Sequence, residues 1–456
     1  MGFADRRNLY ESLPGWMKGA VGLVPFSWIA GPSYRRTLRR GPAFDRASLE
    51  EIRSYKSVAL GEILDFATRE VPAYRPHRAA VERHEPLEAL KDFPLLDKER
   101  LQERREEYLP ESLARIPHYE ITTGGTSGNQ LRFFVEDHSQ STETAFVHRV
   151  WSRVGYTPRS TKATFRGVSF AGLAPGVYWQ SNPIYRELQF SPFHMNEDTL
   201  PAYIDRLSAF APDFLHGYPS AIDTLAEYLL RENLADRVPP VGAALLASEA
   251  CTQDQRERIE RAFRTRAFPI YGHSERLILG AECQREAVYH HVPDYGLLEI
   301  VDEAGRACLA EGERGELVGT GLWNRAMPLI RYRTGDRATR LASRCSCGRS
   351  WERFTDVEGR WKQEMLEGRS GARISLTALN MHGPVLENVV RYQYVQSEPG
   401  LCTFRIVPAP GFGEDDRARI ATAFRDKVGD ELDLTVEIVR TIELTDRGKL
   451  RRLVSE

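Results

Sequence analysis

The sequence has few lysines, no excess of positive charge and no long apolar run. Eight of its 62 basic residues are lysines, and 64 acidic residues bring the formal net charge to -2. This balance excludes the broad basic surface on which non-specific nucleic-acid binding depends. No stretch reaches the roughly 18 to 20 uninterrupted apolar residues of a membrane-spanning helix. Prolines, glycines and Lys18 interrupt the best candidate, residues 13–32, which we expect to be buried or docked on the surface.

The cysteines do not form a disulfide framework. All six lie in the second half of the chain, whereas small secreted domains carry dense, regular cysteine pairs. The stretch 13–32 also lacks the charged start and cleavage site of a secretory signal. We therefore predict reduced thiols and a cytoplasmic protein. A homodimer is one arrangement that would bury the apolar N-terminal stretch.

The 456 residues are too many for one compact core and predict more than one domain. Residues 1–110 are predicted to form a mainly helical collar, because apolar residues recur at helical spacing through 45–69. From about 120 to 340, short apolar strands alternate with helices, which is typical of an α/β body with largely parallel sheets. Near the C-terminus, a strand over 403–407, a helix over 415–428 and a strand over 435–439 predict a small α+β domain.

A loop rich in glycine and hydroxyl groups is the strongest local signal. Residues 122–128 read Thr-Thr-Gly-Gly-Thr-Ser-Gly and precede a strand-like segment at 131–135. Glycines let successive backbone N–H groups face phosphate oxygens, and the hydroxyls can donate further hydrogen bonds. A polar hairpin turn would have the same composition. The Walker spacing and the G-x-G-x-x-G fingerprint are both absent.

Four further motifs follow this loop along the chain. They are Tyr271-Gly272-His273-Ser274-Glu275, Arg331-Tyr332-Arg333-Thr334-Gly335-Asp336, Gly359-Arg360 and Gly448-Lys449. In this order, the five elements resemble the signatures of adenylate-forming enzymes, whose loop commonly reads T-S-G-T-[ST]-G-K-P. Residues 327–334, 345–349 and 71–74 resemble the phenylacetate-CoA ligase branch, and residues 13–32 and 215–220 resemble its CapK-like members. The resemblance covers essentially the whole chain.

The resemblance implies a fold and a reaction. The fold would be α/β, with a large N-terminal body of several subdomains (1–360) and a small mobile α+β lid domain (361–456). A carboxylic acid would attack the α-phosphorus of ATP, pyrophosphate would leave, and an acceptor would then displace AMP. CoA is the acceptor that the family favours, which makes the protein an AMP-forming acid–thiol ligase. An amide ligase or a carrier-protein loader would share the first step, and a non-catalytic nucleotide-binding homologue is the alternative from another class.

The resemblance also assigns roles to individual residues. Glu275 would bind Mg²⁺, Tyr271 would stack on adenine, and Asp336 would accept hydrogen bonds from the ribose hydroxyls. Lys449 would pair with the reacting carboxylate and the bridging oxygen, and Arg360 would lie at the hinge. The remaining nucleotide-binding residues are Thr122, Thr123, Gly124, Gly125, Thr126, Ser127, Gly128, Ser248, Glu249, Gly272 and Ser274, and the acid would contact His216, Gly217 and Tyr218.

Each role has a structural alternative. Glu275 could form a surface ion pair with Arg276, Asp336 could be a turn residue, and Lys449 could be a solvated cation. Ser248-Glu249 follows an apolar strand and could equally cap a helix. The sequence also departs from the family, because Asn129-Gln130 replace the usual Lys-Pro and remove a phosphate-facing cation, which predicts weaker nucleotide binding.

A zinc site is the last candidate. Cys345 and Cys347 form a C-x-C pair, and Cys283 precedes His290-His291. Zinc favours four thiolate or imidazole ligands, and the resemblance implies a structural zinc at these positions. Only one histidine can face the cysteines, since neighbouring residues of a strand point to opposite faces. We choose His291, because the Val-Pro-Asp that follows it aligns better; buried free thiols are the alternative.

Overall fold

The computed structural model describes residues 24–123, 131–168, 170, 174, 176–359, 364–381, 383–443 and 451–455. The chain divides into two compact units. Unit 1 combines residues 1–121, 132–158 and 269–360, and unit 2 combines residues 122–131, 159–268 and 361–456. Neither unit is a continuous segment. The predicted domains, 1–360 and 361–456, meet where the last segment of unit 2 begins. This division into two domains stays a prediction.

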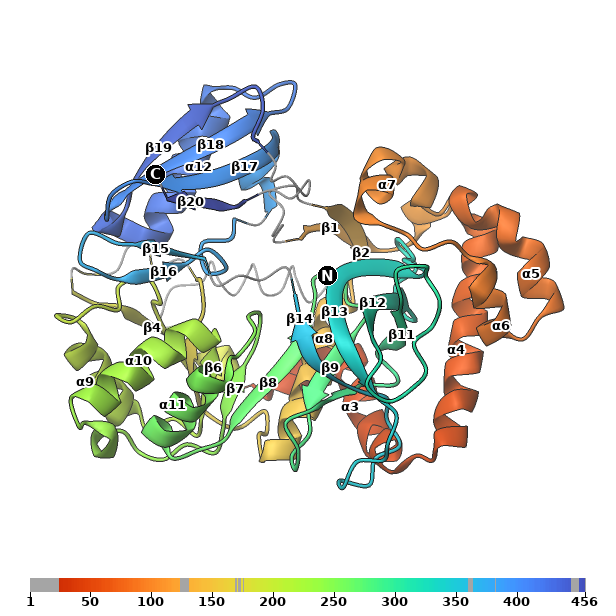
Figure 1. Cartoon of the computed structure of the whole chain (residues 1–456), viewed down its shortest axis with the longest axis horizontal. Coiled ribbons are helices and arrows are strands. Elements are labelled where there is room, and N and C mark those ends of the chain that lie inside the picture. The colour runs from red at the N-terminus through yellow and green to blue at the C-terminus, as the bar shows by residue number, and fades with distance from the viewer. Residues whose placement is uncertain are drawn as a thin grey trace. The chain divides into compact units, whose positions relative to one another are not determined.

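The N-terminal part of unit 1 is mainly helical (Figure 1). Ser48 starts one helix with a capping box, in which its hydroxyl accepts from Glu51 N and the Glu51 carboxylate accepts from Ser48 N. The first helix, which contains Gly31 and Pro32 at a kink, packs against the helix that begins at Ser139. The helices of unit 1 are α3 (Phe26–Arg46), α4 (Leu49–Glu70), α5 (Arg78–Arg83), α6 (Pro86–Ala89), α7 (Lys98–Glu103) and α8 (Ser139–Trp151).

The main sheet of unit 1 is antiparallel, so the prediction of largely parallel sheets is wrong for this unit. Its successive strands are joined by loops without a helix, and parallel pairing would need a longer crossover. In spatial order the strands are β11 (Gly296–Val301), β12 (Arg314–Gly321), β13 (Tyr332–Leu341), β14 (Arg353–Glu358), β10 (Tyr289–His291), β9 (Leu279–Glu282) and β8 (Ala267–Gly272). A separate pair is formed by β1 (His118–Thr122) and β2 (Arg132–Glu136).

Unit 2 contains the parallel α/β layer that the sequence predicts. Its strands lie in the order β7 (Ala244–Leu246), β6 (Phe214–Gly217), β3 (Lys162–Phe165), β5 (Glu187–Phe190) and β4 (Trp179–Asn182). All neighbouring pairs are parallel except β4 with β5. Figure 1 shows β6 and β7 beside the helices α9 (Leu200–Phe210), α10 (Pro219–Arg231) and α11 (Gln253–Phe263). The carboxyl ends of the parallel strands therefore share one edge, where ligands of α/β sheets usually bind.

The C-terminal part of unit 2 is α+β, as predicted. Its strands β15 (Met365–Glu367) and β16 (Arg373–Ser375) form a hairpin, and a four-stranded sheet has the order β19 (Asp433–Ile438), β18 (Leu401–Pro408), β17 (Val389–Gln396) and β20 (Leu453–Ser455). The helix α12 (Glu414–Val428) connects β18 to β19.

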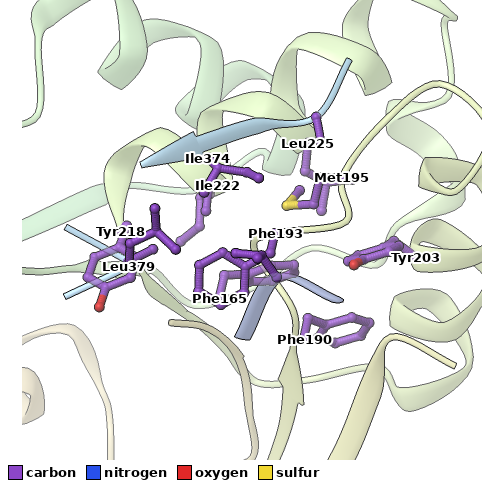
Figure 2. Close-up of a cluster of buried hydrophobic side chains, with 14 of the residues drawn as sticks. Phe165, Phe190, Phe193, Met195, Tyr203, Tyr218, Ile222, Leu225, Ile374 and Leu379 are labelled. Atoms are coloured by element: carbon purple, nitrogen blue, oxygen red, sulfur yellow. The ribbon is translucent and has the colours of Figure 1, made fainter. Parts of the chain in front are cut away.

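One hydrophobic core in unit 2 includes residues from both 159–268 and 361–456. In Figure 2, Ile374 of the hairpin lies near Ile222 of α10, and Phe193 lies close to Phe165. Phe193 is fully buried and belongs to this core. Among the described residues, no helix has both the length and the apolar character needed to cross a bilayer.

Candidate active site

Glu275 lies in the turn that follows β8, and two side chains hold its carboxylate. His273 Nδ1 lies 3.2 Å from Glu275 Oε2, and the Tyr332 hydroxyl donates to Oε1 at 2.9 Å. His273 Nε2 accepts from the backbone N–H of Ile278 at 3.2 Å, so the ring proton of a neutral His273 sits on Nδ1 and points at the carboxylate. The structure therefore shows an oriented, largely buried carboxylate and no ion pair with Arg276.

The same contacts keep Glu275 ionised. Burial alone would raise the pKa of Glu275, but the hydrogen bonds from His273 and from the Tyr332 hydroxyl lower it from 4.5 to about 2. A carboxylate that stays charged in a buried position is suited to a divalent cation, since Mg²⁺ prefers one or two carboxylates together with phosphate oxygens. The Glu275 carboxylate therefore fits the role of the predicted magnesium ligand.

Asp336 is paired with Tyr271 in the same unit. Residues Tyr332, Thr334 and Asp336 alternate along β13 and are buried, whereas Arg333 and Gly335 between them are exposed. The Tyr271 hydroxyl donates to Asp336 Oδ2 at 2.9 Å, and burial raises the pKa of Tyr271 well above its usual value. The phenol therefore remains a donor and orients the carboxylate. Both carboxylates that the resemblance assigns to the nucleotide are thus held by tyrosine hydroxyls.

A hollow in unit 1 opens beside Glu275. Its wall combines Glu275 and the adjacent Arg276 with mainly apolar side chains. The lining residues are Val135, Glu275, Arg276, Leu277, Gly321, Trp323, Asn324, Met327 and Leu329.

The phosphate loop is described only at its ends. Thr123 N donates to Leu131 O at 2.9 Å, and Leu131 N donates to Thr123 Oγ1 at 3.0 Å. Thr122 ends β1. These contacts join the two ends of the loop. Of the other predicted site residues, Gly124, Gly125, Thr126, Ser127, Gly128, Arg360 and Lys449 lie outside the described residues, while Gly272 ends β8 and Ser274 lies in the turn beside Glu275.

In unit 2, the residues predicted to bind the acid lie at the carboxyl end of β6. The His216 ring is buried, and its Nδ1 lies 2.8 Å from Leu245 O. The Tyr218 hydroxyl is 3.5 Å from Gly167 N, and the Arg166 guanidinium lies over the Tyr218 ring. Arg166 Nη2 donates to Ser248 Oγ at 3.0 Å. Predicted residues that follow different strands are thus brought together at one edge of the sheet.

Glu249 has a structural role in unit 2. Its Oε2 accepts from the backbone N–H of Ser220 at the start of α10, and its Oε1 accepts from Ser375 Oγ at 2.5 Å. Burial raises the pKa of Glu249 despite these hydrogen bonds. In the structure, Glu249 thus binds the N-terminus of a helix, which is the structural alternative given for it. A contact of Glu249 with the nucleotide stays a prediction.

Gly217 cannot be replaced without a clash. A Cβ atom at this position would lie 2.3 Å from Phe165 O. We expect Gly217→Ala to lower the free energy of unfolding by about 2–4 kcal/mol, because backbone must move to relieve the overlap. Denaturant unfolding measures the change, with Gly413→Ala as the control, where a new Cβ meets no atom within 4 Å. Equal stability of the two variants would contradict the prediction.

The structure corrects the choice of histidine in the predicted metal site. The donor atoms of Cys283, His290, Cys345 and Cys347 all lie within 4.8 Å of one another. The Cys283 and Cys345 sulfurs are 3.5 Å apart, and Cys347 Sγ is 3.7 Å from His290 Nε2. His291 points to the other face of β10, where its Nε2 lies 2.8 Å from Gly296 O. Alternation along the strand thus places His290, and not His291, beside the cysteines.

The donor set fits zinc. Three sulfurs and one imidazole nitrogen are a usual ligand set for a structural zinc. Burial and the positive charges of Arg153, Arg349 and Arg353 lower the pKa of His290 to about 3, so its imidazole is neutral and can donate a lone pair. Its Nδ1 is buried without a hydrogen-bond partner among the described residues.

Sequence reasoning assigned no role to His273 or Tyr332, although both hold Glu275. Both residues stand inside the motifs that were recognised. The spacing of Tyr332 and Asp336 on a strand places them on one face, which was a usable signal. The position of His273 gave no such signal. Its side-chain direction is set by a turn and not by a regular strand.

Known proteins of two kinds are similar to this chain. Residues 366–456 match the CapK C-terminal domain. Phenylacetate-coenzyme A ligase of Thermus thermophilus is 25% identical over 462 residues, covering 91% of this chain and 98% of that protein. Protein CapK of Staphylococcus aureus is 23% identical over 337 residues and 72% of each chain. The chain is a homologue of phenylacetate-CoA ligases and of CapK.

Solved structures support the fold of this chain. A crystal structure of 2-hydroxyisobutyryl-CoA ligase with 2-HIB-AMP and CoA, in the thioesterification state, has a TM-score of 0.58 at 19% identity and covers 91% of this chain and 92% of that one. A postadenylation structure of the same ligase with R3-HIB-AMP has a TM-score of 0.58 at 18% identity. The predicted α/β fold class is confirmed.

Proposed function

We propose that the chain is an AMP-forming ligase that activates a carboxylic acid with ATP and transfers the acyl group to CoA. The observation that carries the proposal is the pair of oriented carboxylates, Glu275 and Asp336, each held by a tyrosine hydroxyl in unit 1. The relatives support the same activity, because the Thermus protein is named a phenylacetate-CoA ligase and aligns along nearly its whole length.

In this reaction most of the catalysis is positioning and charge neutralisation. Asp336, oriented by Tyr271, would accept hydrogen bonds from the ribose hydroxyls and fix the nucleoside. Glu275 would hold Mg²⁺, which supplies positive charge to the phosphate oxygens. Lys449 would pair with the acid carboxylate and the bridging oxygen as charge builds between them. His216, Gly217 and Tyr218 would contact the acid.

The test is carboxylate-dependent exchange of pyrophosphate into ATP, measured over a panel of aryl, fatty, hydroxy and amino acids that includes phenylacetate. We expect exchange with at least one acid and release of AMP only when CoA is added. Transfer to an amine or a carrier protein instead of CoA would favour the amide ligase or the carrier loader. No exchange with any acid would leave a non-catalytic nucleotide-binding homologue. Exchange unaffected by Lys449→Ala would refute the role of Lys449.

We also propose that Cys283, His290, Cys345 and Cys347 hold a structural zinc ion. The purified protein is expected to contain about one zinc per chain, because the described residues include one four-ligand cluster. His290→Ala should remove most of this zinc, because it deletes a ligand. Elemental analysis by inductively coupled plasma mass spectrometry checks the content, and His291→Ala is the matched control. Equal zinc content in the two variants would contradict the assignment.

A further inference from the structure

The Arg276 side chain lines the hollow beside Glu275, and its guanidinium carries a donor without a partner among the described residues. Its Nη2 donates to Gln140 Oε1 at 2.9 Å, which fixes the side chain. Its Nη1 is buried and has no hydrogen-bond partner among the described residues. A buried, charged donor without a partner costs free energy that a bound acceptor would recover.

The carboxylates near Arg276 are occupied by other groups. Both oxygens of Glu275 accept from His273 and Tyr332, and Glu143 Oε2 accepts from the Tyr295 hydroxyl at 2.5 Å. Burial raises the pKa of Glu143, while the positive charge of Arg276 acts in the opposite direction. Arg276 forms no ion pair with either carboxylate within the described part of the chain.

The other polar groups in the wall of the hollow also have partners. Trp323 Nε1 donates to Tyr295 O at 2.7 Å. The Asn324 side chain accepts from Glu136 N and donates to Phe134 O and Met327 O. The remaining wall residues are Val135, Gly321, Leu277, Met327 and Leu329. Among the described side chains of this wall, Arg276 therefore carries the buried donor that has no partner.

The backbone of Arg276 is held in the left-handed region, at φ 58°. An arginine adopts this conformation at a cost, and such residues concentrate at functional sites. The turn bond from Arg276 N to His273 O at 3.0 Å links this conformation to the residue that orients Glu275. One turn thus presents a carboxylate and a guanidinium to the same hollow.

We propose that Arg276 Nη1 binds an oxyanion of a substrate next to the cation that Glu275 would hold. This proposal rests on the proposed function for the identity of the substrates. Residues 122–130 contain neither lysine nor arginine, so the loop supplies no side-chain cation for a triphosphate. The expected oxyanion is accordingly a phosphate of the nucleotide, and the carboxylate of the acid is the other source with the same chemistry.

The test uses equilibrium binding, which does not require turnover. Titration calorimetry of the full chain with magnesium α,β-methylene-ATP, with adenosine and with phenylacetate separates the two sources. Arg276→Met is expected to weaken binding of the methylene analogue about 10- to 100-fold, as loss of a charged hydrogen bond does, and to leave adenosine unchanged. If Arg276→Met weakens the binding of phenylacetate and not that of the methylene analogue, the proposal holds with the acid as the source of the oxyanion. Unchanged affinities, or no binding of either anionic probe to the unaltered chain, would overturn it.

Two further variants separate binding from structure. Gln140→Glu keeps Arg276 but gives it a carboxylate partner, so the anion should bind several-fold more weakly while the melting temperature does not fall. If Arg276 served only packing, this new ion pair would leave binding unchanged, and that result would overturn the proposal. Arg276→Lys should restore part of the affinity that Arg276→Met loses. Arg306→Met, which removes an exposed cation paired with Asp302, is the charge control and should bind every probe normally.

A failed exchange assay and a failed binding test have different meanings. Absence of exchange with every acid, together with loss of nucleotide binding in Arg276→Met, would refute the ligase and retain the oxyanion site. Exchange in the unaltered chain, together with normal binding and normal Michaelis constants in Arg276→Met, would retain the ligase and refute the oxyanion site.

Discussion

Glu275→Gln is expected to lower the rate of ATP–pyrophosphate exchange by roughly 100- to 1000-fold, the range seen when a group that stabilises transition-state charge is removed. The amide carries no charge to hold a cation. Its NH₂ group would also face one of the two donors, His273 Nδ1 or the Tyr332 hydroxyl, that now point at the carboxylate. The exchange rate at saturating acid, with Mg²⁺ varied, measures the effect.

Glu303→Gln provides the control for this variant, because Glu303 is an exposed carboxylate of the same unit. It should exchange at the normal rate. The pKa of Glu275 lies at about 2, so its carboxylate stays ionised as pH falls from 7 to about 4, and the defect should persist over that range. The stability that this depressed pKa contributes is present above 4.5 and is lost as pH falls toward 2. A Glu275→Gln variant with normal exchange would refute the role of Glu275.

Arg149→Met is expected to lower the free energy of unfolding of unit 1 by about 3–5 kcal/mol, since it leaves a buried charge without its partner. Arg149 donates to both oxygens of Asp294, at 2.9 and 2.6 Å, and both side chains are about 5% exposed or less. Helix α3 passes so close that a Cβ on Gly41 would lie 2.3 Å from Arg149 Cδ. Urea unfolding followed by fluorescence measures the loss.

The double variant Arg149→Met with Asp294→Leu is the control for this pair. Replacing both partners by apolar groups removes the uncompensated charge, so most of the lost stability should return. If the double variant is as unstable as the two single variants combined, the loss comes from packing and not from the ion pair.

The sequence predicted the parts of the site that depend on local order along the chain. The recognised motifs contain Tyr271, Glu275 and Asp336, and the residue types of these motifs indicate their chemistry. The structure brings Tyr271 into contact with Asp336. The C-terminal α+β elements were predictable because apolar periodicity changes between strand and helix there. The antiparallel sheet of unit 1 was not, because periodicity does not report strand direction.

The choice between His290 and His291 shows a second limit. Strand alternation requires that one of them face the cysteines, but it does not say which. Pairing with β9 and β14 fixes that choice, and β14 lies far from β10 in sequence. Arg276 is similar, since the sequence offered it only as an alternative ion-pair partner of Glu275, whereas the structure gives Gln140 as its hydrogen-bond partner.

The contacts of residues 364–381 within unit 2 bear on the predicted lid domain, residues 361–456, and on how such a domain could turn. Ser375 is bound to Glu249, Arg373 to Glu227 at 2.9 Å, and Ser370 to Asn196 at 2.6 Å. A reorientation that preserved these three bonds would have to pivot beyond Met381 and carry only the later strands and α12. A pivot at Arg360 would instead have to break all three bonds. The free energy of these bonds would then set the fraction of time that a lid domain spends detached from residues 196–249.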